Sequence, residues 1–498
     1  SSTPAQYDPA AFGWPLASPS ACVPNTETIL AYTFNPSFNS QGDTSSAGLR
    51  LPFAVKGCSY LAGRELNWML GSFSANNTAQ YVAQPGSALL SIVAGYRDFA
   101  LHNSGRRPLL LLTSNDGILY GVDVASGEMQ WGWMPRHFVA ELGQYSNLLS
   151  KKLFDGGLRV VDAVDTDRSP SYANWASYVV GTAQGGAYHY GLKLSSNTKA
   201  SDTAGPKPVA QAWGIHVSGG TSPQMQEPVF VTLKGSQYAM FVVNTAQGTV
   251  STSTLYQVNV ATGAIQTAQL AFVAHSTLNW DAATGTLWLG DNKGKVWSLY
   301  INDLRKAQHE GTVSPAESIL YAGYGEVHGA PYVWVATKYQ ISVFGLAGNA
   351  SKAITWSSRG GPNPQALGPG STAQAGIAAF RKGGEISASP VLVNGVLVVP
   401  IHVSDDASSC SIGKGYYNLF NLDNGTTPQH VTFNNNPVKH GEIYVGEGAP
   451  LTPSIHESAR GMVVFPGSNA PATSSDTANG SINFGGNPFS RRLHWRQR

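Results

Sequence analysis

The chain has 498 residues, a formal net charge of +2 and a charged fraction of 12%, which is about half the average of about 25% in globular proteins. This near-neutral balance excludes the strong field that draws proteins to nucleic acid, and no apolar run reaches the roughly 18 residues of a membrane span. Glycine (55 residues) and uncharged polar residues replace the charges, which favours an exported β-rich protein over a helical cytosolic enzyme.

The first 66 residues differ from the rest. They begin with a stretch rich in proline and serine and hold a polar loop at 41–46 between two apolar runs. We therefore expect residues 1–66 to form an N-terminal extension that packs on one large domain, 67–498. The polar start at Ser1 is what a mature exported chain shows after its signal peptide is cleaved, and a chain that starts within a longer protein would look the same.

Three cysteines are too few for a disulfide scaffold, and their spacing is not that of a zinc site. Cys22 and Cys58 lie in the same N-terminal stretch, and in an oxidising compartment we expect a disulfide between them. Cys410 then has no partner. The alternative is that all three cysteines are buried thiols.

From residue 67 onward the chain consists of short runs rich in Val, Ile, Tyr, Trp and Thr, bounded by turn residues, which predicts strands and hairpins. The clearest is 115–131, where alternating apolar residues lead into a turn at Ser126 and Gly127 and return through Trp131. The same pattern recurs at 255–263, 294–300 and 417–425.

A single hairpin cannot bury both of its faces. A β-propeller solves this problem by repeating four-stranded sheets, or blades, of about 40–50 residues around an axis. Residues 67–498 have room for roughly six to eight blades, and we expect about seven. The predicted fold class is therefore all-β, a β-propeller with a short N-terminal extension. An array of β-sandwiches is the alternative, and the helix candidates are short, at 136–149 and 372–380.

The polar residues give little sign of an active site. None of the 12 histidines pairs at metal-binding spacing, and the sequence has neither a nucleophile elbow nor a phosphate-binding glycine loop. The members of a Ser-His-Asp triad come from distant positions, but nothing in the sequence points to one. We expect the chain not to be an enzyme and to carry no cofactor.

An acidic group at Asp162, Asp165 and Asp167 has two interpretations. The spacing puts Asp165 and Asp167 on one strand face or in one loop. A loop held by Asx turns is the simpler interpretation, and a displaced metal site formed by Asp165 and Asp167 is the sharper one.

Aromatic residues also allow two interpretations. Most will pack in the blade cores. Those in loops, such as the pairs Trp131 and Trp133 or Tyr416 and Tyr417, are alternatively contacts for a ligand such as a glycan.

Residues 122–131 resemble the quinoprotein repeat, in which an Asp-x-x-Thr-Gly turn is followed by a tryptophan. Enzymes, outer-membrane assembly lipoproteins and pilus proteins share that repeat. The wider segment 108–135 is similar to the signature of the PilY family: an apolar strand, Asn-Asp-Gly, a small loop, Asp-x-x-Ser/Thr-Gly-Glu, an aromatic pair and a proline. Further segments similar to that family lie, in order, at 70–72, 96–99, 154–158, 284–302 (with Gly290, Asp291, Gly294 and Trp297), 385–400, Cys410 with Gly413, and 492–496.

The resemblance implies a PilY-type protein of the type IV pilus tip. Members of the family sit on minor pilins, help to prime pilus assembly and present a surface for adhesion to a host or other ligand. The chain would then be exported through the periplasm to the cell surface. The likeness covers the propeller only, and the long N-terminal module of many members has no counterpart in the sequence.

Several members of the family bind calcium in a loop directly before the Gly-Asp strand. The corresponding residues here are Thr277, Asn279, Asp281 and Gly285. Calcium takes six to eight oxygen ligands, whereas this loop keeps one carboxylate, Asp281, and one amide carbonyl, Asn279. The resemblance thus implies a degenerate calcium site. The alternative is an ordinary hairpin turn in which Asp281 caps local backbone amides.

The segment 492–496 is similar to the last strand of the family. Such a strand closes a propeller, and in a tip protein it can also pair with a minor pilin by β-augmentation. Deletion of residues 488–498 should then prevent incorporation into pili. The residues that would bind the partner are Arg492, Leu493, Trp495 and Arg496.

Two other functions use the same repeat. A quinoprotein (PQQ-type) dehydrogenase usually needs a calcium-bound quinone, a catalytic aspartate and often adjacent cysteines, and no two cysteines are adjacent here. A periplasmic propeller scaffold, similar to the outer-membrane assembly lipoproteins, begins with a lipidated cysteine, whereas this chain begins with Ser1. The leading hypothesis is a non-enzymatic protein of the pilus tip.

Overall fold

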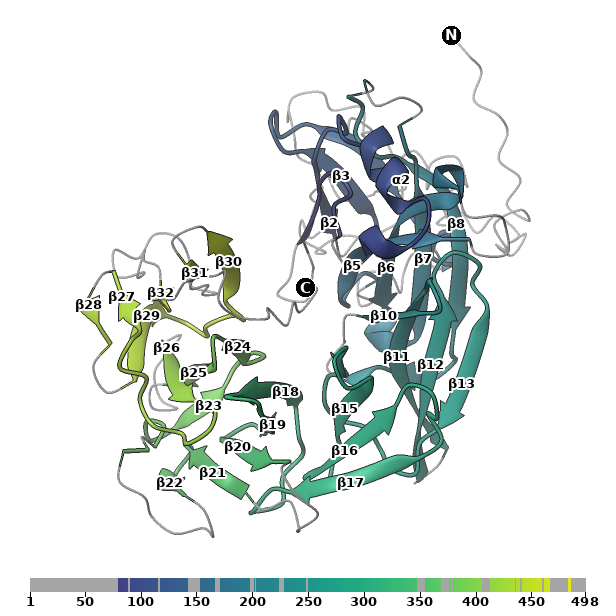
Figure 1. The fold of residues 1–498 in the computed structure, drawn as a ribbon. Helices are drawn as coiled ribbons and strands as arrows, with labels where there is room; N and C mark the ends of the chain where they lie inside the picture. The colour runs from purple at the N-terminus through teal and green to yellow at the C-terminus, as the bar shows by residue number, and fades with distance from the viewer. Residues whose placement is uncertain are drawn as a thin grey trace, which may run out of the picture. The chain divides into compact units, whose positions relative to one another are not determined.

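A computed structural model describes the chain from residue 79 to 484 (Figure 1). Within that span it leaves out residues 88–89, 115–116, 142–152, 166–170, 198–200, 202, 224–227, 248–249, 347–353, 369–375, 378, 405–412, 435, 439–440, 459–460 and 466–481. The predicted extension 1–66, its boundary with the propeller and the strand at 492–496 therefore lie outside the described residues. So do Cys22, Cys58, Cys410 and Asp167.

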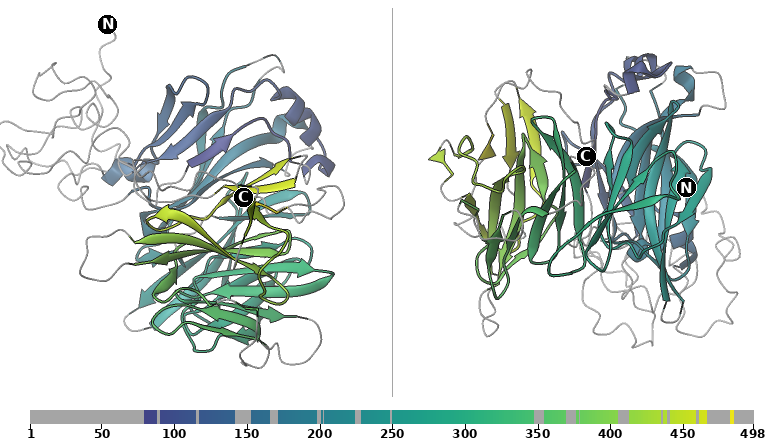
Figure 2. Two further views of the ribbon diagram at one scale, coloured as in Figure 1. Left: turned by 90° about the vertical axis from the view of Figure 1, so that its left-hand side faces the viewer. Right: turned by 60° about the horizontal axis from the view of Figure 1, so that its bottom comes forward.

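The chain divides into two compact units. The first comprises residues 1–246 and 256–267, and the second comprises 247–255 and 268–498. Each unit is built from twisted antiparallel sheets, which can be followed in Figure 2.

Unit 1 contains two four-stranded sheets and most of a third. In the first sheet, β1 to β4 pair antiparallel in chain order. In the second sheet, β5 to β8 repeat this arrangement. The strands are β1 (Ala79–Val82), β2 (Leu109–Thr113), β3 (Leu119–Asp123), β4 (Met129–Trp133), β5 (Leu158–Val164), β6 (Trp175–Ala183), β7 (Tyr188–Leu194), β8 (Pro208–His216), β9 (Gly220–Thr221), β10 (Val229–Leu233), β11 (Ser236–Gln247), β12 (Val250–Asn259) and β13 (Ile265–Gln269).

Unit 2 continues with four more sheets, of which the first is the meander β14 to β17. The others have one additional short strand each. The strands are β14 (Asn279–Asp281), β15 (Thr286–Gly290), β16 (Lys295–Tyr300), β17 (Ala307–Thr312), β18 (Tyr321–Val327), β19 (Ala330–Ala336), β20 (Gln340–Gly345), β21 (Ile354–Arg359), β22 (Gln365–Leu367), β23 (Gly384–Ile386), β24 (Val391–Val393), β25 (Val396–Val403), β26 (Lys414–Asn421), β27 (Thr432–Phe433), β28 (Asn436–Pro437), β29 (Glu442–Glu447), β30 (Ser454–Ser458), β31 (Gly461–Phe465) and β32 (Ile482–Asn483).

The described residues thus form seven sheets. The first six follow one another along the chain, and the seventh joins β30 to β32 with β27 and β28, which precede β29 of the sixth sheet. Repeated antiparallel meanders of four strands are the blades of a β-propeller, which confirms the predicted fold class. The inner strands explain why each blade needs its neighbours. All nine residues of β6 are buried, because apolar side chains of the first and third sheets cover its two faces.

The predicted hairpin at 115–131 consists of β3, a tight turn and β4. Asp123 ends β3, and its Oδ1 accepts hydrogen bonds from the backbone N–H groups of Ala125 (3.0 Å) and Ser126 (2.8 Å). Gly127 closes the turn with φ +73° and donates its N–H to the carbonyl of Asp123 at 2.8 Å. Another blade repeats this turn with asparagine in place of aspartate, at Asn259 with Gly263. At Asn421 with Gly425 the backbone hydrogen bond is the same, and the Asn421 amide donates to the Thr426 hydroxyl at 3.0 Å.

Tryptophans link consecutive blades within each unit. The indole N–H of a tryptophan in the fourth strand of one blade donates to a backbone carbonyl in the turn before the last strand of the next blade. The ring of Trp213 also packs against Gly263 of that turn, and the ring of Trp356 packs against Gly425. The pairs are Trp131 with Pro206 (2.9 Å), Trp213 with Val260 (3.1 Å) and Trp356 with Leu422 (2.8 Å).

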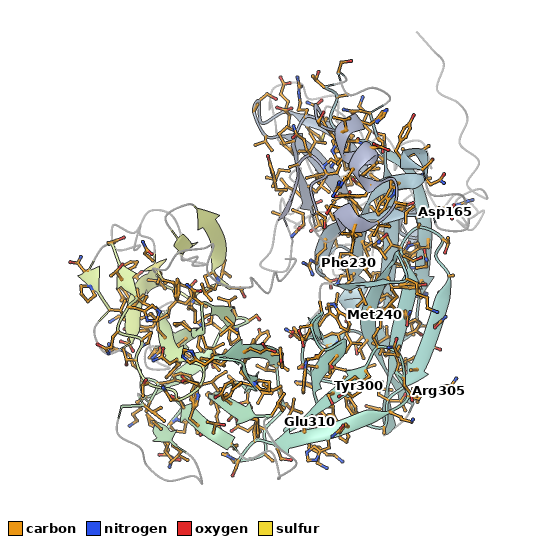
Figure 3. All side chains as sticks on the ribbon, viewed as in Figure 1. Asp165, Phe230, Met240, Tyr300, Arg305 and Glu310 are labelled. Carbon is orange, nitrogen blue, oxygen red and sulfur yellow. The ribbon has the colours of Figure 1, made fainter. Side chains whose placement is uncertain are left out.

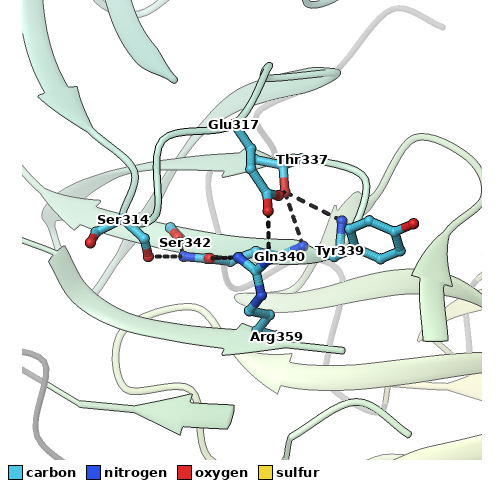
Figure 4. Close-up of polar contacts among 7 residues, drawn as sticks. All are labelled: Ser314, Glu317, Thr337, Tyr339, Gln340, Ser342 and Arg359. Carbon is cyan, nitrogen blue, oxygen red and sulfur yellow. Dashed lines mark hydrogen bonds and ion pairs between the residues drawn. The ribbon is translucent and has the colours of Figure 1, made fainter. Parts of the chain in front are cut away.

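A polar network fixes the loop before β18 to its blade (Figure 4). The guanidinium of Arg359 lies 2.5 Å from Glu317 Oε1, and the Thr337 hydroxyl donates to Glu317 Oε2 at 2.8 Å. Arg359 also donates to Gln340 Oε1 at 3.2 Å, and the Gln340 amide donates to the carbonyl of Ser314. These half-buried contacts attach the incoming loop to β20 and β21.

Helices are few and short in the described residues. The candidate at 136–149 is helical at its start, as α3 (Arg136–Glu141). The candidate at 372–380 is wrong where it can be tested, because Ile377 forms an isolated β-bridge with Thr426 instead. An additional helix, α2 (Tyr96–His102), lies between β1 and β2. Single helical turns are η2 (Leu90–Ile92), η4 (Tyr172–Asn174) and η5 (Gln184–Gly186).

None of the helices in the described part of the chain has the length and apolar character needed to cross a bilayer.

Candidate functional site

Helix α2 packs on the second blade and forms one wall of a surface pocket. The Trp175 indole N–H, at the start of β6, donates to the carbonyl of Ala94 at 3.0 Å. The Trp175 ring also lies edge-on to Tyr96, with centroids 4.8 Å apart, and contacts Phe99. Tyr96, Phe99 and Trp175 are almost fully buried, so the helix is held rigidly against the sheet.

A chain of polar contacts attaches α2 to strands β5 and β6. The Tyr96 hydroxyl donates to Asp162 Oδ2 at 2.8 Å, and the Ser177 hydroxyl donates to Asp162 Oδ1 at 2.6 Å. Arg106 in turn donates to Ser177 at 2.9 Å. The loss of solvent around these groups raises the pKa of Asp162 and lowers that of Arg106, and in both cases it outweighs their mutual attraction.

The pocket has a volume of about 310 Å³, at the lower end of the range of about 300–1,000 Å³ for ligand pockets. Buried apolar side chains line its base, and Asn103 joins its two sides, because Asn103 Oδ1 accepts the backbone N–H of Asn197 at 3.0 Å. The side chains that reach its rim are His102 from α2, Tyr172 from η4, Lys193 from β7, Ser196 from the following loop and Val209 from β8.

The predicted calcium loop is the β14–β15 hairpin. Asn279 and Asp281 share one face of β14 and are both nearly buried. Asp281 Oδ1 accepts the backbone N–H of Ala283, and Oδ2 accepts the N–H and the hydroxyl of Thr284. Both carboxylate oxygens of Asp281 are therefore engaged within the turn. These contacts are those expected of the hairpin alternative, and calcium binding at this loop stays a prediction.

The aspartate of the Gly-Asp-x-x-Gly-x-x-Trp segment also forms its hydrogen bonds within the segment. Asp291 Oδ1 accepts the backbone N–H groups of Lys293 and Lys295, each at 2.8 Å, and Oδ2 accepts the Trp297 indole N–H at 3.0 Å. The Trp297 ring stacks on Phe272 with centroids 4.5 Å apart. Asp291 thus fixes the β15–β16 turn and the tryptophan that follows it.

Among the described residues, the acidic side chains of the segment 162–167 do not form one site. Asp162 lies on β5 and is used by Tyr96 and Ser177, as above. Asp165, labelled in Figure 3, follows the end of β5, and its backbone N–H donates to the carbonyl of Asn174. Asp167 lies outside the described residues, so the alternative metal site stays untested. No group of three or more histidine, cysteine or acidic side chains that could hold a metal occurs among the described residues.

The aromatic candidates mostly belong to the fold. Trp131 packs against Gly121 and donates to Pro206, and the Trp133 ring contacts that of Tyr190. Tyr417 is fully buried. Tyr416 is nearly so, and the guanidinium of Arg381 lies over its ring at 4.5 Å. We therefore assign these four aromatics to packing.

Sequence reasoning missed the α2 pocket. Its residues come from four segments far apart in the sequence, and none of them forms a recognisable motif. The nearest signal in the sequence is the segment 96–99, which resembles the PilY family and forms the start of α2.

No protein-family model matches the chain. Among curated proteins, the type IV pilus biogenesis factor PilY1 homolog of Xylella fastidiosa (strain Temecula1) is 21% identical over 292 residues, which cover 54% of this chain and 23% of that protein. The structure places the segments 108–135 and 290–297, which resemble the PilY family, in blade strands and turns. The chain is a PilY-like β-propeller. It spans less than a quarter of the length of its relative.

Solved structures with some likeness to this PilY-like propeller include BamB from Moraxella catarrhalis, with 11% identity, 79% coverage of this chain, 87% of that chain and a TM-score of 0.33. Another is the quinohemoprotein alcohol dehydrogenase from Comamonas testosteroni, with 11% identity, 72% and 63% coverage, and a TM-score of 0.41. Likenesses this distant say nothing about the activity of the chain.

Proposed function

We propose that this chain is a non-enzymatic protein of the type IV pilus, exported through the periplasm to the pilus tip, where it docks on minor pilins and supports pilus assembly and adhesion. The observation that carries the proposal is the match to a pilus biogenesis factor across 54% of the chain. This match supports a pilus-related role. Location at the tip, docking on minor pilins and adhesion are the more specific parts of the proposal.

The hydrogen bonds that Asp281 and Asp291 accept within their own turns support a role without catalysis. A bound quinone with calcium needs carboxylates that point at the metal. Asp281 and Asp291 instead accept hydrogen bonds from their own turns. We therefore also propose that the chain works without a metal or cofactor at these two turns.

Docking on a minor pilin would use the segment 488–498. Its strand-like pattern at Arg492–Arg496 suits β-augmentation, in which an added strand supplies backbone hydrogen bonds to an exposed sheet edge. This part of the proposal rests on the sequence alone, since the segment lies outside the described residues.

Deletion and complementation in the source cells test the proposal. Few or no pili should be recovered by shearing from a strain without the chain, and expression of the full chain should restore them. A chain that lacks residues 488–498 should accumulate in the periplasm, fold, and fail to restore pili. Normal piliation without the chain would contradict the assembly role, and restoration by the truncated chain would contradict the docking strand alone.

A further inference from the structure

The α2 pocket is a preformed site whose surroundings are fixed. Its base and walls are held by the Trp175 contact with Ala94 and by the Asn103 contact with Asn197. Little reorganisation is needed before a ligand enters, which lowers the cost of binding. None of these contacts belongs to the repeated blade turns, so the pocket is a local addition to the propeller and not a requirement of the fold.

An aromatic pair forms the exposed wall of the pocket. The rings of His102 and Tyr172 stack with centroids 4.1 Å apart and an interplanar angle of 11°. Tyr172 keeps 44% of its surface exposed although it is a large aromatic residue. A rigid aromatic surface beside water favours a ligand with a flat apolar face and a polar edge, which is the character of the C–H face of a sugar ring.

The hydrogen-bonding groups of the rim suit a ligand rich in hydroxyls. The Nδ1 atom of His102 donates to the carbonyl of Asp98 at 2.9 Å, so in the neutral ring Nε2 is an acceptor. Tyr172 and Ser196 add hydroxyl groups, each of which both donates and accepts. The pocket thus offers donors and acceptors together beside the aromatic wall.

The charge of the pocket indicates whether a neutral or an anionic sugar would bind. Lys193 is exposed and is the lysine among the described residues that line the pocket, and these include no aspartate or glutamate. In the described part of the chain no carboxylate pairs with it. A cation that pairs with no carboxylate of the described residues, at the edge of a partly enclosed site, favours an anionic ligand.

We propose that the α2 pocket binds a sugar residue that carries a carboxylate, such as a uronic acid unit of a polysaccharide. The sugar ring packs on Tyr172, its hydroxyls bond to His102 and Ser196, and its carboxylate pairs with Lys193. The inference rests on the proposed function in one respect, because it supplies the ligand class for adhesion at the pilus tip.

Calorimetric titration of the purified full chain with trigalacturonate tests the inference. We expect weak binding, with a Kd of about 1 mM, and about tenfold weaker binding of the methyl ester, which keeps the ring and loses the charge. Lys193→Gln and Tyr172→Ala should each weaken binding by about tenfold. Lys293→Gln and Tyr300→Ala, at exposed positions in unit 2, are the matched controls and should leave the affinity unchanged.

The outcomes distinguish the possible failures. Trimannuronate, a second trisaccharide of uronic acid units, repeats the test, and its binding would also support the proposal. No binding of either trisaccharide, equal binding of the methyl ester, or equal loss in the Lys293 control overturns the pocket assignment. If the chain binds trigalacturonate but is absent from pili, the pilus proposal fails alone. If pili carry the chain and neither trisaccharide binds, the pocket proposal fails alone.

Discussion

The Trp213 indole N–H donates to the carbonyl of Val260 at 3.1 Å, and so links the second blade of the propeller to the third. Trp213→Phe keeps most of the apolar ring and removes the donor, which leaves a shielded carbonyl without this bond. We expect a loss of about 1–3 kcal/mol in the free energy of unfolding of unit 1, measured by urea unfolding with circular dichroism. Trp133→Phe, at a half-buried ring against Tyr190, is the control and should cost less. Equal losses would contradict the linking role.

Gly425 and Gly127 make a matched pair of turn glycines. Both have a left-handed backbone, with φ +70° and +73°, so alanine at either position costs about 1 kcal/mol in backbone strain. A Cβ at Gly425 would lie 2.6 Å from Trp356 Cδ2, whereas at Gly127 nothing lies within 4 Å. We expect Gly425→Ala to lower the free energy of unfolding by a further ~1–3 kcal/mol, because the added methyl group overpacks the site. Thermal unfolding of both variants measures the difference, and similar losses would contradict blade packing against this glycine.

Buried His189 predicts a dependence of stability on pH. Its Nε2 donates to the Gly186 carbonyl, its Nδ1 accepts the Thr182 hydroxyl, and burial lowers its pKa from 6.5 to about 3. The unfolded chain therefore binds a proton in this range that the folded chain does not. The stabilising contribution of neutral His189 is complete above about pH 6.5 and falls by about 1.4 kcal/mol per pH unit as the pH drops toward about 3.

His189→Gln isolates this effect, because the amide can donate to the same carbonyl and accept from the same hydroxyl without titrating. Urea unfolding of both proteins between pH 7 and pH 4 is the measurement. The wild-type chain should lose stability faster than the variant on acidification. Parallel curves would show that His189 does not titrate on unfolding.

Substitution of Asp281 distinguishes a structural turn from a calcium site. We expect Asp281→Ala to lower the free energy of unfolding by about 1–2 kcal/mol, because two backbone N–H groups of the turn lose their acceptor. The loss should be the same in excess CaCl₂ and in EDTA. A rise in the melting temperature of the wild-type chain with calcium that Asp281→Ala abolishes would instead establish a metal site at this loop.

Local sequence patterns predicted much of the propeller because its blades depend on short-range turns. An Asn-Gly pair is a strong hairpin signal, and Asn394 and Gly395 both have positive φ between β24 and β25. The turn at Ser126 and Gly127 was found in the same way. These turns need particular residues at particular positions, so they leave a signal in the sequence.

Features that depend on distant contacts left no such signal. Helix α2 has seven residues and follows a glycine with a left-handed backbone, so it lacks the length for clear helical periodicity. Asp162 sits in an acidic cluster in the sequence, yet its partners Tyr96 and Ser177 come from other elements. The pocket between His102, Tyr172 and Lys193 likewise exists only after α2 has packed on the second blade.

The most direct test of the account is the location of the chain on isolated pili. Pili sheared from the source cells should carry immunogold label for this chain at filament ends, and mass spectrometry of the same sample should find minor pilins with it. A strain that lacks the chain gives the background. Label confined to the periplasm, with no chain in the sheared pili, would contradict the pilus-tip role.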